Sequence, residues 1–374
     1  MIKIQHLIIS KNNRENSSST RSRLFNIEPI GIGTSSVESL RSYIGRLAIG
    51  HTVRVGDLLK YEIVEKLGIT EYEFYSNRSQ INKFGPFTEN LVSVLEELTK
   101  RTDLGYLTLR KWKNAFPNRN GIFHQHLKWC TKCLMELRDN NQDIYEPLIW
   151  TIYCINMCPK HKIELSSVCP HCCKSPKSFS PRYRPGYCPH CEKWLGEEIP
   201  FKEIVGIELE RQLMLSNAVG ELLSHNNVQS KTIEKEDITV SIIRIMEKAT
   251  KGNNKEFAEL INKSRDLIWL WKNGKRYPEF ESLIDICEAT NIKVVDFLLN
   301  RIEYSSVENK KIPHKKILRK KSAVERDYVQ IEKQLECSFL NEYPPPSLAE
   351  LKKRLNYNKI REKFPLLSGM STLN

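Results

Sequence analysis

The sequence lacks the features of a membrane-spanning, secreted or disordered protein. Its longest apolar run, near Leu148 to Met157, is about half of the ~20 residues that a membrane-spanning helix needs. The apolar start at Leu7 to Ile9 is too short for a secretory signal and runs into Lys11 and Arg14. Hydrophobic residues make up 40% and charged residues 28%, which excludes a mainly disordered or collagen-like chain. We therefore expect a soluble, cytoplasmic protein with no membrane partner.

Acidic residues are fewer than basic ones. The 374 residues include 58 Lys and Arg against 45 Asp and Glu, which gives a formal net charge of +13. Such an excess indicates a polyanionic partner. The surplus is concentrated in residues 310–321, in the loop 174–187 and in residues 346–363. We interpret this distribution as an extended track along a DNA backbone.

Eleven cysteines are too few for a disulfide scaffold, and their spacing indicates metal binding. Eight candidate ligands fall in four pairs with two residues between the partners: Cys130 and Cys133, Cys158 and His161, Cys169 and Cys172, and Cys188 and Cys191. This gap lets one tight turn present two side chains to a tetrahedral Zn²⁺. In the last three pairs a proline follows the first cysteine and fixes φ in the turn. We predict two structural zinc ions per chain.

The spacing leaves the grouping of the pairs open. We expect sequential sites, but loop-closure entropy favours them over an interleaved cross-brace by only about 0.3 kcal/mol. A redox role for the pairs is disfavoured because no strand–helix context surrounds them. Cys154, Cys173, Cys287 and Cys337 are left over, and we expect them to be bystanders in a reduced protein.

Helical periodicity organises the rest of the chain into a multidomain, mainly α protein. Leu40, Tyr43, Ile44 and Leu47, for example, fall at helical spacing. We predict a flexible N-terminal arm at 1–29, a helical part at 30–128, tandem zinc-ribbon or knuckle modules at 129–196, a helical region with a helix-turn-helix at 197–300, a basic linker at 301–322 and a second helix-turn-helix unit at 323–374.

Residues 236–300 are predicted to form five short helices, and their core signal from Phe257 to Pro278 resembles the helix-turn-helix of the lambda repressor and Cro. The resemblance is carried by a small crossing residue, an N-cap serine, a tryptophan, a glycine stop and a proline, which are Ala258, Ser264, Trp271, Gly274 and Pro278. In such domains the second helix, here from about Arg265 to Lys272, enters the major groove. The resemblance implies DNA contacts by Lys263, Ser264, Arg265, Trp269, Lys272, Lys275 and Arg276.

Two features of this motif favour phosphate contact over base reading. Lys263 stands where the core residue before the cap is usually apolar, and Leu267, Trp269 and Leu270 stand where polar base readers are expected. Packing of this helix on another protein is the alternative, because exposed aromatic residues often mark interfaces.

The C-terminal unit has a second pattern of this kind. Ser347 and Glu350 form a capping box ahead of a helix whose apolar face carries Leu351 and Leu355. A short helix from Asn358 to Phe364 is predicted next. We expect DNA contacts from the basic and amide residues of both helices, which are Lys352, Lys353, Asn358, Lys359, Arg361 and Lys363. The alternative is a solvated basic helix.

The chain as a whole resembles the TniQ/TnsD family of transposon target-selection proteins. Residues 38–48 are similar to the family's opening helix, and residues 107–112 are similar to its second signature. The most specific match is the run from Tyr145 to Cys172, which contains the second and third ligand pairs. The additional helix-turn-helix units favour the longer, TnsD-like branch. The first pair lacks the family's usual proline, and we still expect a complete zinc site there.

The resemblance implies an adaptor without catalytic activity. Such a protein binds an attachment site in double-stranded DNA, at the bacterial nucleoid, and recruits a TnsC-like AAA+ ATPase that regulates the transposase. Some relatives work instead with an RNA-guided CRISPR effector complex, so a protein-interaction adaptor without DNA reading of its own is the alternative. The sequence shows no phosphate-cradling Gly-rich loop and no acidic metal triad, and closed zinc sites disfavour a nuclease.

Overall fold

The structure, a computed structural model, describes residues 21–116, 122–197, 203–227, 233–302, 323–342, 346–355, 357 and 359–364. This part of the chain is mainly α, as predicted. In these described residues, β-type backbone pairing occurs as isolated β-bridges, such as those between Trp129 and Ser166 and between Met157 and Glu164. No helix among the described residues is both long and apolar enough to cross a membrane.

The N-terminal part is a group of short helices around α1. Its elements are α1 Leu40–Gly50, α2 Val55–Leu58, the π-helical turn η1 Leu59–Ile63, α3 Val64–Leu67, α4 Glu71–Ser76, η2 Arg78–Gln80, α5 Pro86–Thr99, η3 Leu104–Leu107 and η4 Arg110–Trp112. Ser39 caps α1 by accepting a hydrogen bond from the Ser42 amide, and Pro86 occupies the first turn of α5, where no amide donor is needed. The α1 stripe predicted from the sequence is fully buried.

Residues 21–29 pack on this helical group, although we expected them to belong to a flexible arm. Leu24 is 4% exposed, and its amide donates to the Leu98 carbonyl at 2.9 Å. The Asn26 side-chain amide donates to the Thr99 carbonyl at 2.8 Å. These bonds satisfy carbonyl groups that the end of α5 leaves without an intrahelical partner, which explains why the segment is held. The ordered contacts therefore begin before residue 30, and residues 1–20 lie outside the described part.

The cysteine-rich region follows as α6 Thr131–Asp139, the short turn η5 Leu148–Thr151 and irregular chain. It shares one hydrophobic core with the N-terminal helices. Trp112, Trp129 and Trp150 belong to the same buried cluster, which also contains Cys130 and Cys169. The hydrophobic core is therefore continuous across residues 128 and 129.

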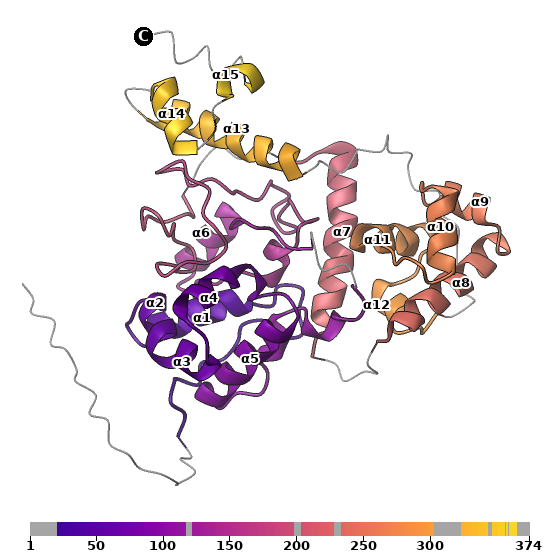
Figure 1. The fold of residues 1–374 in the computed structure, drawn as a ribbon, viewed down its shortest axis with the longest axis horizontal. Helices are drawn as coiled ribbons and strands as arrows, with labels where there is room; N and C mark the ends of the chain where they lie inside the picture. Colours follow the sequence, from indigo (N-terminus) through magenta and orange to yellow (C-terminus); the bar gives the residue numbers. More distant parts are fainter. Residues whose placement is uncertain are drawn as a thin grey trace, which may run out of the picture.

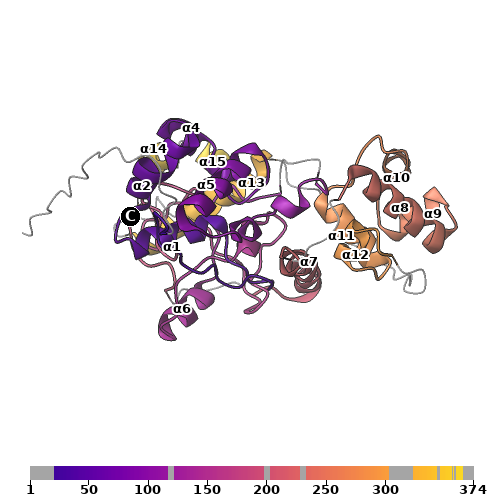
Figure 2. The ribbon, with the colours of Figure 1, turned by 90° about the horizontal axis from the view of Figure 1, so that it is seen from below.

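Helix α7 Gly206–Ser224 stands between this part and a five-helix group (Figures 1 and 2). The group consists of α8 Lys235–Thr250, α9 Asn254–Leu260, α10 Arg265–Lys272, α11 Phe280–Ala289 and α12 Val294–Leu298. Gln212 of α7 accepts a hydrogen bond from the Asn156 amide at 3.0 Å, and Arg211 donates to Asp285 of α11 at 2.5 Å. Side chains of α7 thus bind both neighbours.

The C-terminal unit comprises α13 Ala323–Asn341, α14 Leu348–Leu355 and α15 Ile360–Lys363. It has a small core of its own, formed by Leu335, Leu351, Ile360 and Phe364. Figure 1 shows α13 along the cysteine-rich region. The basic linker predicted at 301–322 falls almost entirely outside the described residues.

Cys173 and Cys337 join the C-terminal unit to the cysteine-rich region. The structure pairs them as a disulfide, so the expectation that both are bystanders is wrong for this structure. Lys333 of α13 also pairs with Glu164 at 2.5 Å. These contacts could not be predicted from local patterns, because the two cysteines are 164 positions apart.

Candidate metal centres and nucleic-acid interface

The eight ligands predicted from the spacing lie in two groups of four. Cys130, Cys133, Cys158 and His161 form the first cluster, and Cys169, Cys172, Cys188 and Cys191 form the second. Within each group the candidate ligand atoms lie within 4.8 Å of one another. The structure therefore brings together sequential pairs and not the interleaved pairs of a cross-brace.

Three of the four pairs are built on the same turn. In the turn that begins at Cys158, the Cys158 amide donates to the Ile163 carbonyl at 2.9 Å, and the Lys162 amide donates to the Cys158 carbonyl at 2.8 Å. The turns at Cys169 and Cys188 repeat both bonds at the same offsets. The residue four positions after the first cysteine has a positive φ in all three, at Lys162, Cys173 and Glu192.

The first pair is built differently, because it begins a helix. Cys130 is the N-cap residue of α6, and Cys133 lies in the first turn. Both sulfurs are thus near the end of the helix where the backbone dipole stabilises negative charge. The helix sets the backbone there, so the pair does not require a proline after its first cysteine.

The spacing of the ligand atoms fits a tetrahedral ion. With metal–sulfur bonds of about 2.3 Å and metal–nitrogen bonds of about 2.05 Å, the edges of the tetrahedron are about 3.8 Å for two sulfurs and about 3.6 Å for sulfur and nitrogen. Sulfur atoms of Cys133 and Cys158 are 3.6 Å apart, and those of Cys172 and Cys188 are 3.8 Å apart. His161 Nδ1 lies 3.3–3.6 Å from the three sulfurs of its cluster.

In each cluster the pKa of one cysteine is lowered, which favours the thiolate form of that residue. Hydrogen bonds from the thiols of Cys130 and Cys133 lower the pKa of Cys158 to about 2. In the second cluster, hydrogen bonds from Cys169 and Cys172 lower the pKa of Cys188. A thiolate held among three further soft ligands is an arrangement that a bound cation stabilises.

Glu136 orients the histidine of the first cluster. Its Oε1 lies 2.9 Å from His161 Nε2, so the Nε2 proton bonds to the carboxylate and Nδ1 is left to face the sulfurs. Lys160 binds the other carboxylate oxygen at 2.5 Å, and this bond is the largest cause of the lowered pKa of Glu136. The sequence analysis missed this residue. Its position three residues after Cys133, on the same helical face, was the available signal.

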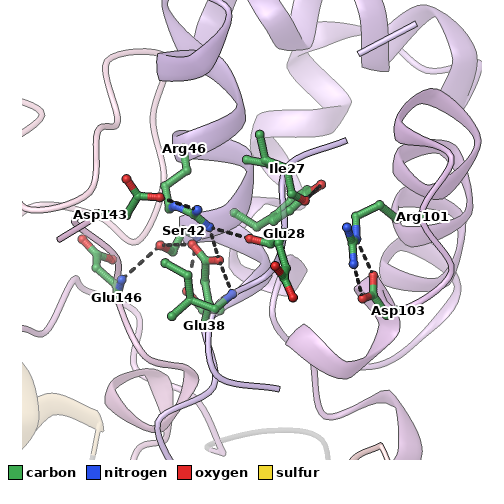
Figure 3. A network of polar contacts seen from close by, with 12 residues as sticks. Ile27, Glu28, Glu38, Ser42, Arg46, Arg101, Asp103, Asp143 and Glu146 are labelled. Carbon is green, nitrogen blue, oxygen red and sulfur yellow. Dashed lines mark hydrogen bonds and ion pairs between the residues drawn. The ribbon is translucent and has the colours of Figure 1, made fainter. Parts of the chain in front are cut away.

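A buried polar network fixes α1 against the loop that precedes Leu148 (Figure 3). Arg46 binds Glu38 of its own helix region at 2.7 Å and Asp143 of the loop at 2.7 Å. Ser42 donates to Glu38 at 2.8 Å and accepts from the Glu146 amide at 3.0 Å. Burial raises the pKa of Glu38 despite these partners.

A second buried contact extends this network into the second cysteine module. Arg41 and Glu146 form an ion pair of 2.7 Å, with side chains 4% and 1% exposed. The Tyr183 hydroxyl donates to the same Glu146 oxygen at 2.8 Å. Burial raises the pKa of Tyr183 well above its usual value, so the phenol stays protonated and can donate. The loop around Tyr183 is therefore attached directly to α1.

Helices α9 and α10 form where the sequence predicted them, with Ser264 between them. The Ser264 hydroxyl accepts from the Leu267 amide at 3.3 Å, and Gly274 has a φ of +63° just after α10. Two of the cations expected at DNA have carboxylate partners. Lys263 pairs with Asp285 at 3.0 Å, and Arg276 pairs with Glu279 at 3.8 Å.

The exposed side of α10 carries both basic and aromatic side chains. Arg265 is exposed, Lys272 is half-buried and Trp269 is 46% exposed. The Lys275 ammonium lies 4.6 Å from the centre of the Trp269 ring, within cation–π range. This face can therefore contact either phosphates or a protein surface.

The basic residues of the C-terminal unit lie far from α10, at the opposite end of the molecule in Figure 1. Ser347 accepts from the Glu350 amide at 3.2 Å, as the predicted cap requires. Lys353 and Lys359 are exposed, Lys352 is half-buried and the Lys363 ammonium lies 5.5 Å from the Tyr328 ring. Asn358 and the side chain of Arg361 lie outside the described residues.

These features define a mainly helical protein with two four-residue Cys/His clusters that could each hold a metal ion. Comparison with known families finds that the TniQ family model matches residues 29–165. The matched stretch contains α1–α6 and the first cluster, and it ends before the second cluster and the helices that follow. No curated protein matches the chain.

Proposed function

We propose that this protein is a target-selection adaptor of a transposition system, which binds an attachment site in double-stranded DNA and recruits a TnsC-like AAA+ ATPase regulator. The observation that carries this proposal is the TniQ match over residues 29–165. The match supports a transposition-associated adaptor, and the longer branch of the family is supported by the helices beyond it.

Two zinc ions per chain are part of this proposal. Both clusters have four soft ligands at tetrahedral spacing, which is the donor set and geometry of structural zinc. A bound zinc ion supplies folding free energy there, on the order of 10 kcal/mol per site. Because protein atoms fill all four positions, the clusters support a structural role and a protein that is no enzyme.

DNA recognition is assigned to α9–α10 and to the C-terminal unit. The Ser264 cap, the length of α10 and the exposed Arg265 favour a helix-turn-helix that contacts DNA. Phosphate contacts from Arg265, Lys275 and Lys353 follow from their exposure and charge.

A protein-interaction adaptor attached to an RNA-guided CRISPR complex is the second candidate. It is favoured by the ion pairs of Lys263 and Arg276 and by the exposed Trp269. Cations that already have carboxylate partners contribute less to phosphate binding, and exposed tryptophans are enriched at the centres of protein interfaces.

Selection of fragments from a genomic DNA library with the full chain, followed by footprinting, separates the two. We expect one enriched duplex site with a protected footprint, and the AAA+ regulator should be retained on that site only when the chain is present. Replacing Arg265 and Arg276 with alanine should weaken binding and make its salt dependence shallower. Equal enrichment of all duplexes would reject sequence-specific recognition and favour the second candidate.

A further inference from the structure

We propose that a cavity between the end of α1 and the loop 181–187 binds a phosphate group of the double-stranded DNA backbone. The inference rests on the proposed DNA-binding function and adds a contact outside every helix-turn-helix. It concerns residues that the sequence analysis did not select individually.

The cavity has a volume of about 190 Å³ and lies where the N-terminal helices meet the second cysteine module. Arg54, the N-cap residue of α2, lines it, and so do Arg182 and Arg184 of the loop. One carboxylate, that of Glu192, also lines it. Two segments that are distant in the chain thus bring three guanidinium groups to one cavity.

The loop is held rigidly by its alternate residues. Tyr183 is buried and binds Glu146, as described above, and Pro185 packs so closely on α1 that a Cβ added to Gly45 would lie 2.6 Å from its Cδ. The Gly56 amide donates to the Pro181 carbonyl at 3.0 Å. Arg182 and Arg184 flank the buried tyrosine and are both exposed. Their backbone positions are therefore fixed before any ligand binds, which lowers the entropy cost of binding.

These arginines are more available to a ligand than Lys263 near α10, which pairs with the buried Asp285 at 3.0 Å. Within the described residues, neither Arg54 nor Arg184 forms an ion pair. Arg182 faces Glu192 at 3.8 Å with both side chains more than half exposed, a geometry that contributes little in water. The Arg184 guanidinium lies 4.0 Å from the centre of the Tyr187 ring, which orients it without neutralising it.

The chemistry of the cavity fits a backbone phosphate. Guanidinium groups bind phosphate oxygens through paired N–H donors, and an exposed group of three concentrates positive charge. Ile49 and Val53, each 43% exposed, form an apolar wall at the same cavity, against which a deoxyribose next to the phosphate can pack. The volume is well above the ~10–15 Å³ that a single water needs.

The test measures the affinity of the full chain for duplex DNA against salt concentration. The variant Arg182→Ala with Arg184→Ala is compared with Arg265→Ala with Arg276→Ala, which removes the same charge elsewhere. Loss of the contact to this one phosphate should make the log–log salt slope shallower by about 0.9 and lower the affinity at 0.1 M salt by about 8-fold. Arg54→Ala should change the slope by about half as much. Arg182→Lys with Arg184→Lys should keep most of the slope of the unmodified chain, because the charge is retained. A small loss is expected because lysine lacks the paired N–H donors.

The experiment separates failure of the proposed function from failure of this phosphate site. Absence of DNA binding by the unmodified chain overturns the proposed function together with this site. Normal binding by the unmodified chain and an unchanged slope in the Arg182 and Arg184 variant overturns this site alone. A poly-glutamate peptide tests the ligand class: if it competes with DNA as well as a second duplex does, and the variant abolishes both interactions, the cavity binds anions in general and the phosphate assignment is wrong.

Discussion

The two metal-ligand clusters use the same two-residue spacing but are held by different structures. The first combines the N-terminus of α6 with one turn, and its histidine is oriented by Glu136. The second consists of two copies of the turn and four thiol ligands. Its ligand Cys172 is followed directly by Cys173, whose pairing with Cys337 attaches the C-terminal unit.

Because of this difference, the two clusters stabilise different parts of the molecule. The first cluster lies in the TniQ-matched stretch and joins α6 to the core of the N-terminal part. The second lies beyond the match and connects that core to the loop with Tyr183 and to α13. We therefore expect damage to the first cluster to affect the TniQ-matched part itself, and damage to the second to affect the attachment of other parts.

Removal of both metals should have the largest effect. The loss of folding free energy is on the order of 10 kcal/mol per site, so residues 125–197 should unfold when a strong chelator is added. Circular dichroism and metal analysis of the same samples measure this effect. Cys287→Ser, which alters a buried cysteine outside both clusters, should still bind two metals per chain. A chelated chain that keeps its fold with less than one metal would contradict a structural role.

Single ligand substitutions should separate the clusters. Cys158→Ser should leave one metal per chain and abolish retention of the AAA+ regulator, because α6 loses its attachment to the core. Cys188→Ser should also leave one metal, while limited proteolysis should detect release of the C-terminal unit. The two variants should each lose several kcal/mol of stability. Identical proteolysis and recruitment in both variants would show that the clusters do not divide these tasks.

A substitution at Gly186, just before the turn that begins at Cys188, should have a smaller effect than loss of a ligand. It has a φ of +77°, and a Cβ there would lie 2.6 Å from the Trp194 ring and 2.8 Å from Ile144. Gly186→Ala should cost about 2–4 kcal/mol through backbone strain and overpacking, and should weaken metal binding in the second cluster only. Gly206→Ala is the matched control, with a φ of +61° and no atom near the new Cβ. Its unfolding free energy should fall by only about 1 kcal/mol.

Glu136→Gln should have the smallest effect and should be confined to the first cluster. A glutamine keeps the shape but gives up the charged acceptor for the His161 ring. We expect the affinity of the first metal to fall by about 10–100-fold, with the second unchanged. Glu192→Gln, beside the second cluster, is the control and should leave both affinities unaltered. Competitive titration with a chromophoric chelator measures both sites, and equal weakening of the two would contradict the assigned role of Glu136.

The sequence predicted what is local and missed what requires tertiary contacts. Ligand spacing, the Ser264 cap and the α10 helix are set by residues within a few positions of one another, and the structure agrees with all three. The grouping of the ligand pairs stayed open because loop entropy hardly separates the alternatives. The Lys263–Asp285 ion pair joins the turn between α9 and α10 to α11, so charge alone indicated a free cation where the fold supplies a partner.

Tyr183 has a consequence for how this protein can be divided. The TniQ match ends at Leu165, but the phenol that covers the buried Arg41–Glu146 pair comes from beyond it. A fragment ending at Leu165 would leave that pair without one of its hydrogen bonds and open to solvent. The TniQ-matched part and the second cysteine module are therefore expected to be inherited together, and recombination between them should be tolerated only where the incoming module supplies an equivalent tyrosine.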